Sequence, residues 1–374
     1  FRRLSSSRPS RRPLSWGSPM RLLVRLMLMG VGLGLLTGSL LRWFAPGVRR
    51  QTLTLPTWLE RQIGFSSGSK DSGQPTSTGQ PKLVNKSFQP TTEIKALSSR
   101  WREIASTQKD LVASAYLLIL DDGRYAQLNA NRPMPAASSI KTPVLLASLE
   151  RIDAQDLYWN EPLELKEDLV GGGAGWMASR PVGSRFPTYE VATEMIRISD
   201  NSATNLLIER AGGQQVVNER FRSLGLPATV INNWLPDLDG TNTTSAHDLS
   251  RSIALVDSGD LLSQRSRDLF RQVMETSVTN TLLPTGLMQG LGGAQGEPDS
   301  SLARKGYRVL NKTGDIGIAY ADAGLIEMPD GRRAVAGFLV KGPFNDPRST
   351  NLIRAMAKAM APHLQPIAAP SPAS

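Results

Sequence analysis

Strand-like segments stand at both ends of residues 91–364, and helical patterns fill the region between them. Short apolar runs with the composition of β-strands occupy 112–120, 125–130, 308–313, 319–328 and 333–340. Asp122-Gly123 and Asp330-Gly331 supply turns for two hairpins. Strands from both ends of a domain can share one sheet when the helices between them are inserted as a block. We therefore predict an α/β (α+β) domain with a five-stranded antiparallel sheet built from both termini.

Helical spacing surrounds this predicted sheet. Residues 92–109 place apolar side chains at the intervals of one helix face, and residues 351–364 close the domain as a second helix. Helices are predicted to dominate from about residue 138 to residue 290. The helical insertion therefore accounts for most of the chain between the two strand groups.

The charge of the chain is concentrated at its N-terminus. Residues 1–50 contain ten arginines and neither lysine nor acidic residues, whereas residues 51–374 carry 33 basic and 33 acidic side chains. The net charge of +10 therefore gives no argument for nucleic-acid binding, and we predict no nucleic-acid partner. Basic residues beside an apolar stretch instead indicate membrane topology.

An uncharged apolar run covers residues 26–41, between Arg25 and Arg42. As a helix it would rise about 24 Å, somewhat less than a hydrocarbon core of roughly 30 Å. Trp43-Phe44 would lie at the far interface. We predict a single-pass anchor at 26–44 in the inner (plasma) membrane. A cleavable signal peptide is the alternative interpretation.

Composition divides the rest of the chain. We predict a basic cytoplasmic N-terminus over 1–25, a flexible linker over 45–90, a folded domain over 91–364 and a disordered tail over 365–374. Under this topology the folded domain lies on the periplasmic or extracellular side. The absence of cysteine excludes disulfides and cysteine-based sites. A Ser-His-Asp triad would require His247 or His363, and no motif marks either residue.

Three short motifs stand in order within the predicted domain. They are Ser138-Ser139-Ile140-Lys141, Ser199-Asp200-Asn201 and Lys312-Thr313-Gly314. Ser138 opens an apolar helical run, so it would lie at a helix N-terminus, with Lys141 one turn further on the same face. A desolvated lysine near another cation can lose its proton and act as a general base. A second Ser-x-x-Lys, at Ser67–Lys70, falls in the predicted linker.

These motifs resemble those of class A β-lactamases and penicillin-binding proteins. The likeness extends to residues 194–207 and to Thr241-Asn242-Thr243-Thr244, and it covers roughly residues 92–364. The resemblance implies a β-lactamase/transpeptidase-like fold and a serine hydrolase that forms an acyl-enzyme. It implies no metal and no organic cofactor.

The resemblance also implies a role for each motif residue. Ser138 would attack the amide carbonyl, Lys141 would take its proton, and Ser199 would pass a proton to the leaving nitrogen. Asn201, Lys312, Thr313, Gly314 and Asp315 would bind the substrate, and the backbone N–H groups of Ser138 and Asp315 would form the oxyanion hole. Asp200 would be structural, and Trp176 would either line the cleft or belong to the core.

The sequence departs from the family pattern in the omega loop. The family has Trp-Glu-Pro-x-Leu-Asn there, whereas this chain has Trp234-Leu235-Pro236-Asp237-Leu238-Asp239. Leu235 therefore replaces the glutamate that activates the deacylating water, and leucine can neither take a proton nor orient water. Asp237 or Asp239 would have to substitute. No arginine follows in 319–328, and Arg332 and Arg333 flank a turn.

Three functions remain open from the sequence. The first is a β-lactamase-like hydrolase with slow deacylation. The second is a penicillin-binding DD-peptidase that acts on D-Ala-D-Ala stems of peptidoglycan. The third is a non-catalytic cell-wall-binding module, which the intact motifs disfavour. The predicted partners are a β-lactam or peptidoglycan-stem substrate and, through residues 26–44, a membrane.

Overall fold

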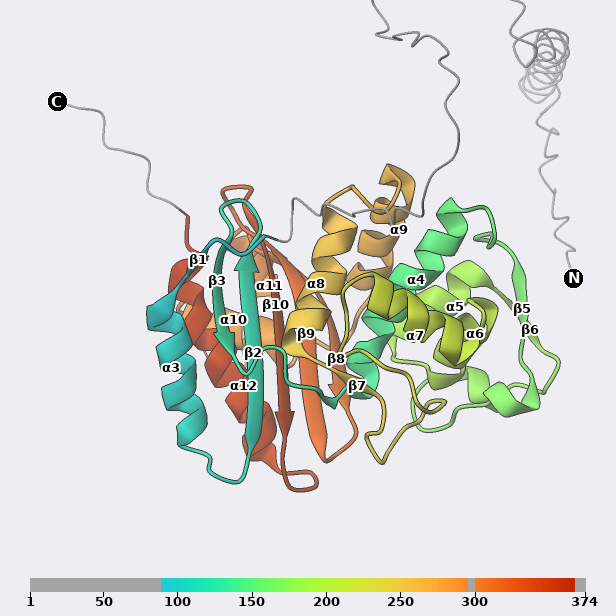
Figure 1. Cartoon of the computed structure of the whole chain (residues 1–374), viewed down its shortest axis with the longest axis horizontal. Helices are drawn as coiled ribbons and strands as arrows, with labels where there is room; N and C mark the ends of the chain where they lie inside the picture. Colours follow the sequence, from blue (N-terminus) through green and yellow to red (C-terminus); the bar gives the residue numbers. More distant parts are fainter. Residues whose placement is uncertain (1–88, 295–299, 367–374) are drawn as a thin grey trace, which may run out of the picture. The chain divides into compact units, whose positions relative to one another are not determined.

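The structure, a computed structural model, describes residues 89–294 and 300–366. One sheet forms the centre of this part (Figure 1). Its strands are β1 (Thr92–Glu93), β2 (Val112–Ile119), β3 (Arg124–Leu128), β8 (Arg308–Asp315), β9 (Ala319–Glu327) and β10 (Arg333–Lys341).

The strand order is β1-β3-β2-β10-β9-β8, so strands from both ends of the domain meet where β2 pairs with β10. The five predicted antiparallel strands are confirmed, with bounds that differ by a few residues. The sheet also has a sixth strand that the sequence did not predict. The two-residue β1 pairs parallel to β3, because Thr92 and Glu93 precede the helix instead of beginning it.

Helices separate and flank the strands. They are α3 (Lys95–Ser106), α4 (Lys141–Asp153), α5 (Thr188–Arg197), α6 (Asn201–Arg210), α7 (Gly213–Ser223), α8 (Ala246–Asp257), α9 (Gln264–Glu275), α10 (Leu283–Gly290), α11 (Ser300–Arg304) and α12 (Pro347–Met360). Short 3₁₀ turns are η1 (Ala137–Ile140), η2 (Glu167–Leu169), η3 (Met177–Ser179) and η4 (Ala361–His363). Two small ribbons pair β4 (Met134–Pro135) with β7 (Thr243–Thr244) and β5 (Pro162–Glu164) with β6 (Arg185–Pro187).

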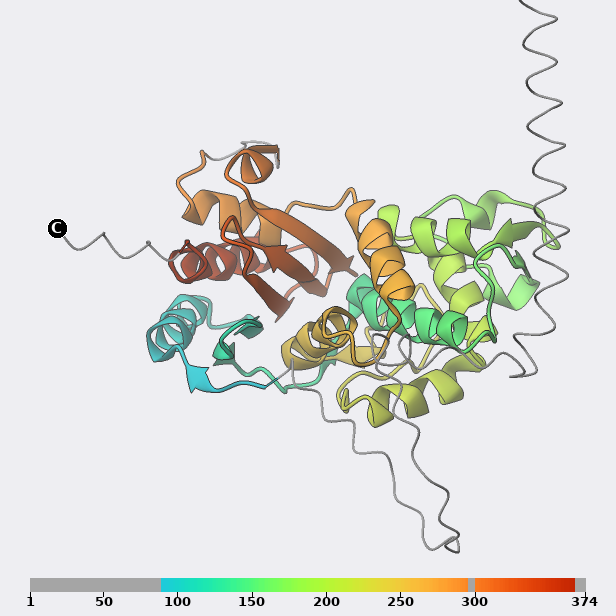
Figure 2. The same cartoon turned by 90° about the horizontal axis from the view of Figure 1, so that it is seen from above.

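Each face of the sheet has its own apolar core. Helices α3, α10 and α12 cover one face, where Trp101 packs edge-on against Phe338 with ring centroids 5.7 Å apart. The inserted helices, including α4 and α8, gather on the other side (Figures 1 and 2). β8 is the free edge of the sheet beside this helical region, and it places its C-terminal residues against η1.

Within residues 89–294 and 300–366, no helix is both long enough and apolar enough to span a membrane. The predicted anchor at 26–44 lies outside the described residues, as does all but the last two residues of the linker predicted over 45–90.

Candidate active site

The amine of Lys141 lies at the centre of the motif residues. Its Nζ is 3.0 Å from the Oγ of Ser138 and 2.9 Å from the Oγ of Ser199. The same nitrogen donates to the backbone oxygen of Ser199 at 2.6 Å and to the Oδ1 of Asn201 at 2.9 Å. The Lys141 side chain is fully buried, whereas both serines are partly exposed. Residues from η1, α4 and α6 therefore meet around one desolvated amine.

Ser138 lies in η1, the 3₁₀ turn that leads directly into α4. The preceding residue, Ala137, has a left-handed φ of 46°, a strained conformation for a residue with a Cβ. The edge strand β8 packs closely on this turn. A Cβ on Gly314 would lie 2.9 Å from the backbone nitrogen of Ser138, so glycine is what permits this approach. Ser138 is thus held between a helix N-terminus and a sheet edge.

Ser199 is also held in a left-handed conformation, with φ of 64°. The next residue, Asp200, caps α6 by accepting a hydrogen bond from the backbone N–H of Ala203. Its carboxylate also accepts from the backbone N–H groups of Trp176 (2.8 Å) and Met177 (2.9 Å). Asp200 therefore has the structural position that the sequence predicted, and it ties the segment before α6 to the loop around residue 175.

Asn201 connects Lys141 to the glycine-rich loop. While its Oδ1 faces Lys141, its Nδ2 donates to the backbone oxygen of Gly172 at 2.8 Å. Its backbone N–H donates to the carbonyl of Ala174 at 3.2 Å. The side chain is thus fixed at both ends, with one face toward the cavity that contains Ser138.

Burial and a nearby cation both lower the pKa of Lys141. Desolvation is the larger cause and places this pKa well below the ordinary value for lysine. The charge of Lys312 lowers it further, and the carboxylate of Asp200 acts in the opposite direction. These conditions favour a neutral amine at Lys141.

Lys312 lies on β8 and is also fully buried. Its Nζ donates to the backbone oxygen of Thr313 at 2.7 Å. Desolvation lowers its pKa to about 8, and the carboxylate of Asp322 partly opposes that effect. Strand alternation places Thr313 on the other face of β8, at the sheet edge, and Asp315 ends the strand as an exposed residue.

A cavity of about 240 Å³ opens beside Ser138. Its lining combines polar residues of the motifs with an apolar wall, and the residues are Ala137, Ser138, Gly173, Ala174, Asn201, Leu235, Pro236, Asp237, Leu238, Asn242, Asp315 and Ile316. Leu235 lines this cavity and is 5% exposed. An apolar side chain of the omega loop therefore forms part of the wall of this cavity.

The backbone of Leu235 is held by a residue that the sequence reasoning did not single out. Asn205 of α6 accepts from the N–H of Leu235 at 2.9 Å and donates to its carbonyl at 2.8 Å. Asn205 lies within residues 194–207, which resemble the family, but the sequence did not indicate that it binds the backbone of Leu235. This pair fixes Leu235 against the helix that follows Ser199.

The two acidic residues considered for water activation have other positions. The carboxylate of Asp237 accepts from the N–H of Thr241 (3.2 Å), the hydroxyl of Thr241 (2.8 Å) and the N–H of Asn242 (2.7 Å). It therefore closes the omega loop on itself. Asp239 is exposed and is not among the residues that line the cavity.

Several other predicted candidates lie elsewhere. Neither histidine lines the cavity of Ser138: His247 packs edge-on against Tyr116, and His363 lies in η4, where burial lowers its pKa. Trp176 packs against Phe186, and its indole N–H donates to Glu194 at 2.8 Å, so it belongs to the core around α5.

The arginines after the third motif are also committed to other partners. Arg332 pairs with Asp330, and Arg333 pairs with Asp257. The second Ser-x-x-Lys, at Ser67–Lys70, lies outside the described residues. Within the described residues, no cluster of His, Asp or Glu could hold a metal ion.

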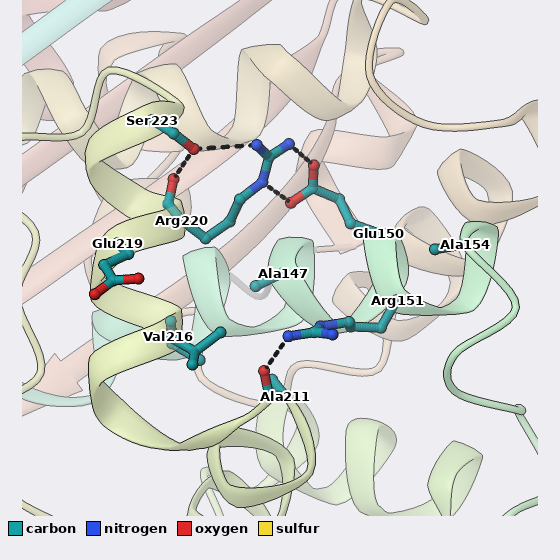
Figure 3. Close-up of a pocket in the computed structure, with 10 residues that line it drawn as sticks. Ala147, Glu150, Arg151, Ala154, Ala211, Val216, Glu219, Arg220 and Ser223 are labelled. Carbon is teal, nitrogen blue, oxygen red and sulfur yellow. Dashed lines mark hydrogen bonds and ion pairs between the residues drawn. The ribbon is translucent and has the colours of Figure 1, made fainter.

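A groove of about 540 Å³ lies away from Ser138, between α4 and α7 (Figure 3). Arg220 of α7 forms an ion pair with Glu150 of α4, and Arg151 donates to the carbonyl of Ala211 at 2.6 Å. The hydroxyl of Ser223 is occupied by Arg220, from which it accepts and to which it donates. The polar groups of this groove therefore connect two helices and form no nucleophile–base pair.

Comparison with known proteins identifies the fold. The model of the Beta-lactamase enzyme family matches residues 93–364. The solved structure of PBP-A is 39% identical, with a TM-score of 0.67, and the match covers 74% of this chain and 98% of that one. A Leu-to-Glu mutant of PBP-A, solved as an acyl-enzyme complex with penicillin G, matches with the same identity and TM-score over 73% of this chain and 98% of that one.

A curated relative supports the same assignment. The β-lactamase of Streptomyces cellulosae is 27% identical over 183 residues, which are 47% of this chain and 59% of that protein. The chain thus spans little more than half the length of this curated relative. The predicted β-lactamase/transpeptidase-like fold is confirmed by the PBP-A structures. The chain belongs to the Beta-lactamase enzyme family.

Proposed function

We propose that this protein is a serine hydrolase that opens β-lactam amides through an acyl-enzyme on Ser138 and releases the product slowly. The observation that carries the proposal is the contact of one buried amine, that of Lys141, with the hydroxyls of both Ser138 and Ser199. The matching family and the penicillin G acyl-enzyme of the PBP-A mutant support the same reaction class.

The hydrogen bonds of Lys141 fit a neutral base. A neutral amine has two N–H groups and one lone pair. The carbonyl oxygens of Ser199 and Asn201 can accept both N–H groups, which leaves the lone pair directed at a hydroxyl. In the proposed acylation, Ser138 loses its proton to this lone pair while its Oγ bonds to the amide carbon. The C–N bond then breaks, and the leaving nitrogen receives a proton through Ser199.

The surroundings of Ser138 support stabilisation of the intermediate. The backbone N–H groups of Ser138 and Asp315 are the proposed oxyanion donors, and the close approach of Gly314 to η1 brings β8 to the nucleophile. Donors of this kind contribute several kcal/mol because they are fixed before the charge develops. Lys312, with Thr313 beside it, is the proposed partner of the substrate carboxylate.

Deacylation is proposed to be slow because the omega loop places no free carboxylate in the cavity. Leu235 lines the cavity with hydrocarbon, and the Asp237 carboxylate accepts three hydrogen bonds from its own loop. Without a general base, hydrolysis of the ester loses roughly 10²–10⁴-fold in rate.

The same observation favours a second candidate, a DD-peptidase that acts on D-Ala-D-Ala stems and is trapped by β-lactams. Such an enzyme needs the acylation machinery but not fast hydrolysis of penicilloyl esters. A non-catalytic binding module is disfavoured, because a purely structural lysine would not need to contact both serine hydroxyls while buried.

The test is stopped-flow hydrolysis of a chromogenic cephalosporin by the full chain, followed by intact-mass analysis. A stoichiometric burst that leaves a persistent covalent adduct is expected, and a Ser138→Ala control should show neither. Sustained turnover without an adduct would contradict slow deacylation. Parallel incubation with a D-Ala-D-Ala peptide measures release of D-Ala, which the second candidate requires.

We also propose that residues 26–44 anchor the chain in the inner membrane with residues 91–364 on the outer side. The arginine excess of residues 1–25 supports this orientation. Protease treatment of spheroplasts should degrade the 91–364 domain from outside. Protection of that domain until the membrane is permeabilised would contradict the proposal.

A further inference from the structure

A buried carboxylate lies under the strand that carries Lys312. Asp322 of β9 is fully buried and is not used by the proposed mechanism. Its Oδ2 accepts from the backbone N–H of Leu283, at the start of α10, at 2.8 Å. Its Oδ1 accepts from the Nδ2 of Asn311 at 2.9 Å, and the same Nδ2 donates to the carbonyl of Thr279. Asp322 of β9 is therefore fixed by hydrogen bonds from β8 and α10.

Asp322 and Lys312 lie on opposite faces of the sheet. In the β8–β9 register, Asp322 is opposite Thr313, and Lys312 is opposite Ala323. Side chains alternate along a strand, so Asp322 shares a face with Asn311 and Thr313, while Lys312 faces η1. The Lys312 amine reaches back to the carbonyl of Thr313, the residue paired with Asp322. A single layer of backbone therefore separates the two groups.

We propose that Asp322 is a positioning residue for Lys312. From the far side of the sheet, the Asp322 carboxylate keeps the Lys312 amine protonated and fixes β8 through Asn311. The role of Lys312 in holding a substrate carboxylate rests on the proposed function. The coupling between Asp322 and Lys312 does not, because it exists in the protein without substrate.

The charges around β8 favour this coupling. Among the elements that pack most closely on β8, charged side chains come from β9 and α9, and they are Asp322, Glu327, Arg265, Arg267, Asp268, Arg271 and Glu275. The further cation that interacts with Lys312 is Lys141, at the start of α4. Burial lowers the pKa of Lys141, which favours its neutral form. Arg271 and Glu275 pair with Glu327 and Arg308, at the opposite end of β8 from Lys312. Asp322 is the carboxylate that opposes the desolvation of Lys312.

Burial disfavours the charged forms of both Asp322 and Lys312. Desolvation raises the pKa of Asp322 to about 7, and the hydrogen bonds from Asn311 and Leu283 oppose that rise. Desolvation lowers the pKa of Lys312 to about 8. An ionised carboxylate favours the protonated amine, so its removal should lower the pKa of Lys312 further. The amine would then lose its charge nearer to neutral pH.

The first test measures Lys312 directly by NMR of the full chain labelled with ¹³C-lysine, with the resonance assigned through Lys312→Arg. Asp322→Asn is expected to lower the pKa of Lys312 by about one pH unit. An unchanged pKa in a folded Asp322→Asn protein would overturn the inference.

If Asp322→Asn does not fold, the unsubstituted protein decides the question. Its Lys312 resonance should move in two steps, once as Asp322 ionises and again as Lys312 itself loses its proton. A single step would overturn the inference, because the two groups would then be electrostatically independent.

The second test follows the rate of covalent labelling by a fluorescent penicillin against pH. In Asp322→Asn the alkaline loss of labelling should begin about one pH unit earlier than in the unsubstituted protein. The matched control is Asp248→Asn in α8, another buried carboxylate with hydrogen bonds to Ala228 and Thr229. A loss of stability alone would leave the alkaline limb in place in both variants, and that result would contradict the inference.

The two proposals fail in different ways. If the unsubstituted protein is not labelled at all, the proposed function fails, and the NMR measurement still decides the coupling. If labelling proceeds but neither Asp322 readout moves, the proposed function stands and the positioning role of Asp322 is wrong.

Discussion

The ionisation of two buried lysines should control how acylation depends on pH. Lys141 must be neutral to accept the proton of Ser138, so acylation should fall as the pH drops through its lowered pKa. Lys312 must be charged to hold a carboxylate, so acylation should fall as the pH rises through about 8. A bell-shaped pH profile of penicillin labelling is expected. Its two apparent pKa values belong to Lys141 and Lys312 together, because the two amines interact. In Lys312→Arg the alkaline limb should disappear, because arginine stays protonated.

Substitution of the nucleophile gives the most direct test at a single residue. Ser138→Ala should abolish labelling by a fluorescent penicillin, because the Ser138 hydroxyl contacts Lys141 and Ser138 lines the cavity. Ser67→Ala, in the second Ser-x-x-Lys of the sequence, is the matched control and should be labelled normally. Labelled Ser138→Ala protein, as seen on a denaturing gel, would remove Ser138 from its assigned role.

Restoring a carboxylate in the omega loop should shorten the life of the acyl-enzyme. Leu235→Glu is expected to raise the deacylation rate by roughly 10²-fold or more, because the side chain at 235 lines the cavity beside Ser138. Leu238→Glu is the control, since that side chain is 66% exposed. The measurement is the decay of the adduct by intact mass. Equal decay in both variants would show that residue 235 does not face the ester.

At the residue scale, the sequence predicted which motif residues lie together around Lys141 but not their backbone conformations. Ser138 and Lys141 are three residues apart, which is about one helical turn, so their proximity could be predicted from the sequence. The left-handed backbone at Ala137 and Ser199 was not predicted, because neither residue is a glycine, the residue that usually marks such a conformation. The hydrogen-bond partners of Asp237 could not be predicted either, because a carboxylate can bind its own loop as readily as it can face a cavity.

The segment around residue 175 shows how one element positions another. Gly175 has φ of 89°, and a Cβ there would overlap the carboxylate of Asp200. Gly175→Ala should displace Asp200 from the N–H groups of Trp176 and Met177, at a cost of about 1.5–3 kcal/mol for each charged hydrogen bond lost. Because Asp200 lies between Ser199 and Asn201, penicillin labelling should slow by about tenfold or more.

Gly183→Ala separates backbone strain from this displacement. Gly183 has the same φ of 89°, but a Cβ there would meet nothing within 4 Å. It should cost about 1–2 kcal/mol in thermal unfolding while labelling stays normal. If both variants were labelled at the same rate, the contact between Gly175 and Asp200 would have no part in the site.

At the element scale, the sequence predicted strands better than junctions. Short apolar runs and the two Asp-Gly turns located five strands within a few residues. The sixth strand, β1, is two residues long and is created by its pairing with β3, so it has no periodicity of its own. The turn η1 was missed for a similar reason, since the packing of β8 and α4 on either side shapes it.

The two cores of the molecule should make separable contributions. Phe338 is fully buried between β10 and α3, on the sheet face away from Ser138. Phe338→Ala should lower the free energy of unfolding by about 3–5 kcal/mol in urea titrations, while the folded fraction is labelled at the normal rate. Phe344→Ala, at a side chain that is 71% exposed, should leave stability nearly unchanged. A slowed labelling rate in folded Phe338→Ala would mean that the two faces are coupled.

For the molecule as a whole, the residues around Ser138 and the omega loop are held by different sets of hydrogen bonds, and α6 is an element that both sets share. Ser138, Lys141 and Ser199 are placed by η1, α4 and the segment just before α6. The omega loop closes on itself through Asp237 and meets this machinery through Asn205. We therefore expect mutations confined to the loop to change the lifetime of the covalent adduct, while the rate at which the adduct forms stays the same.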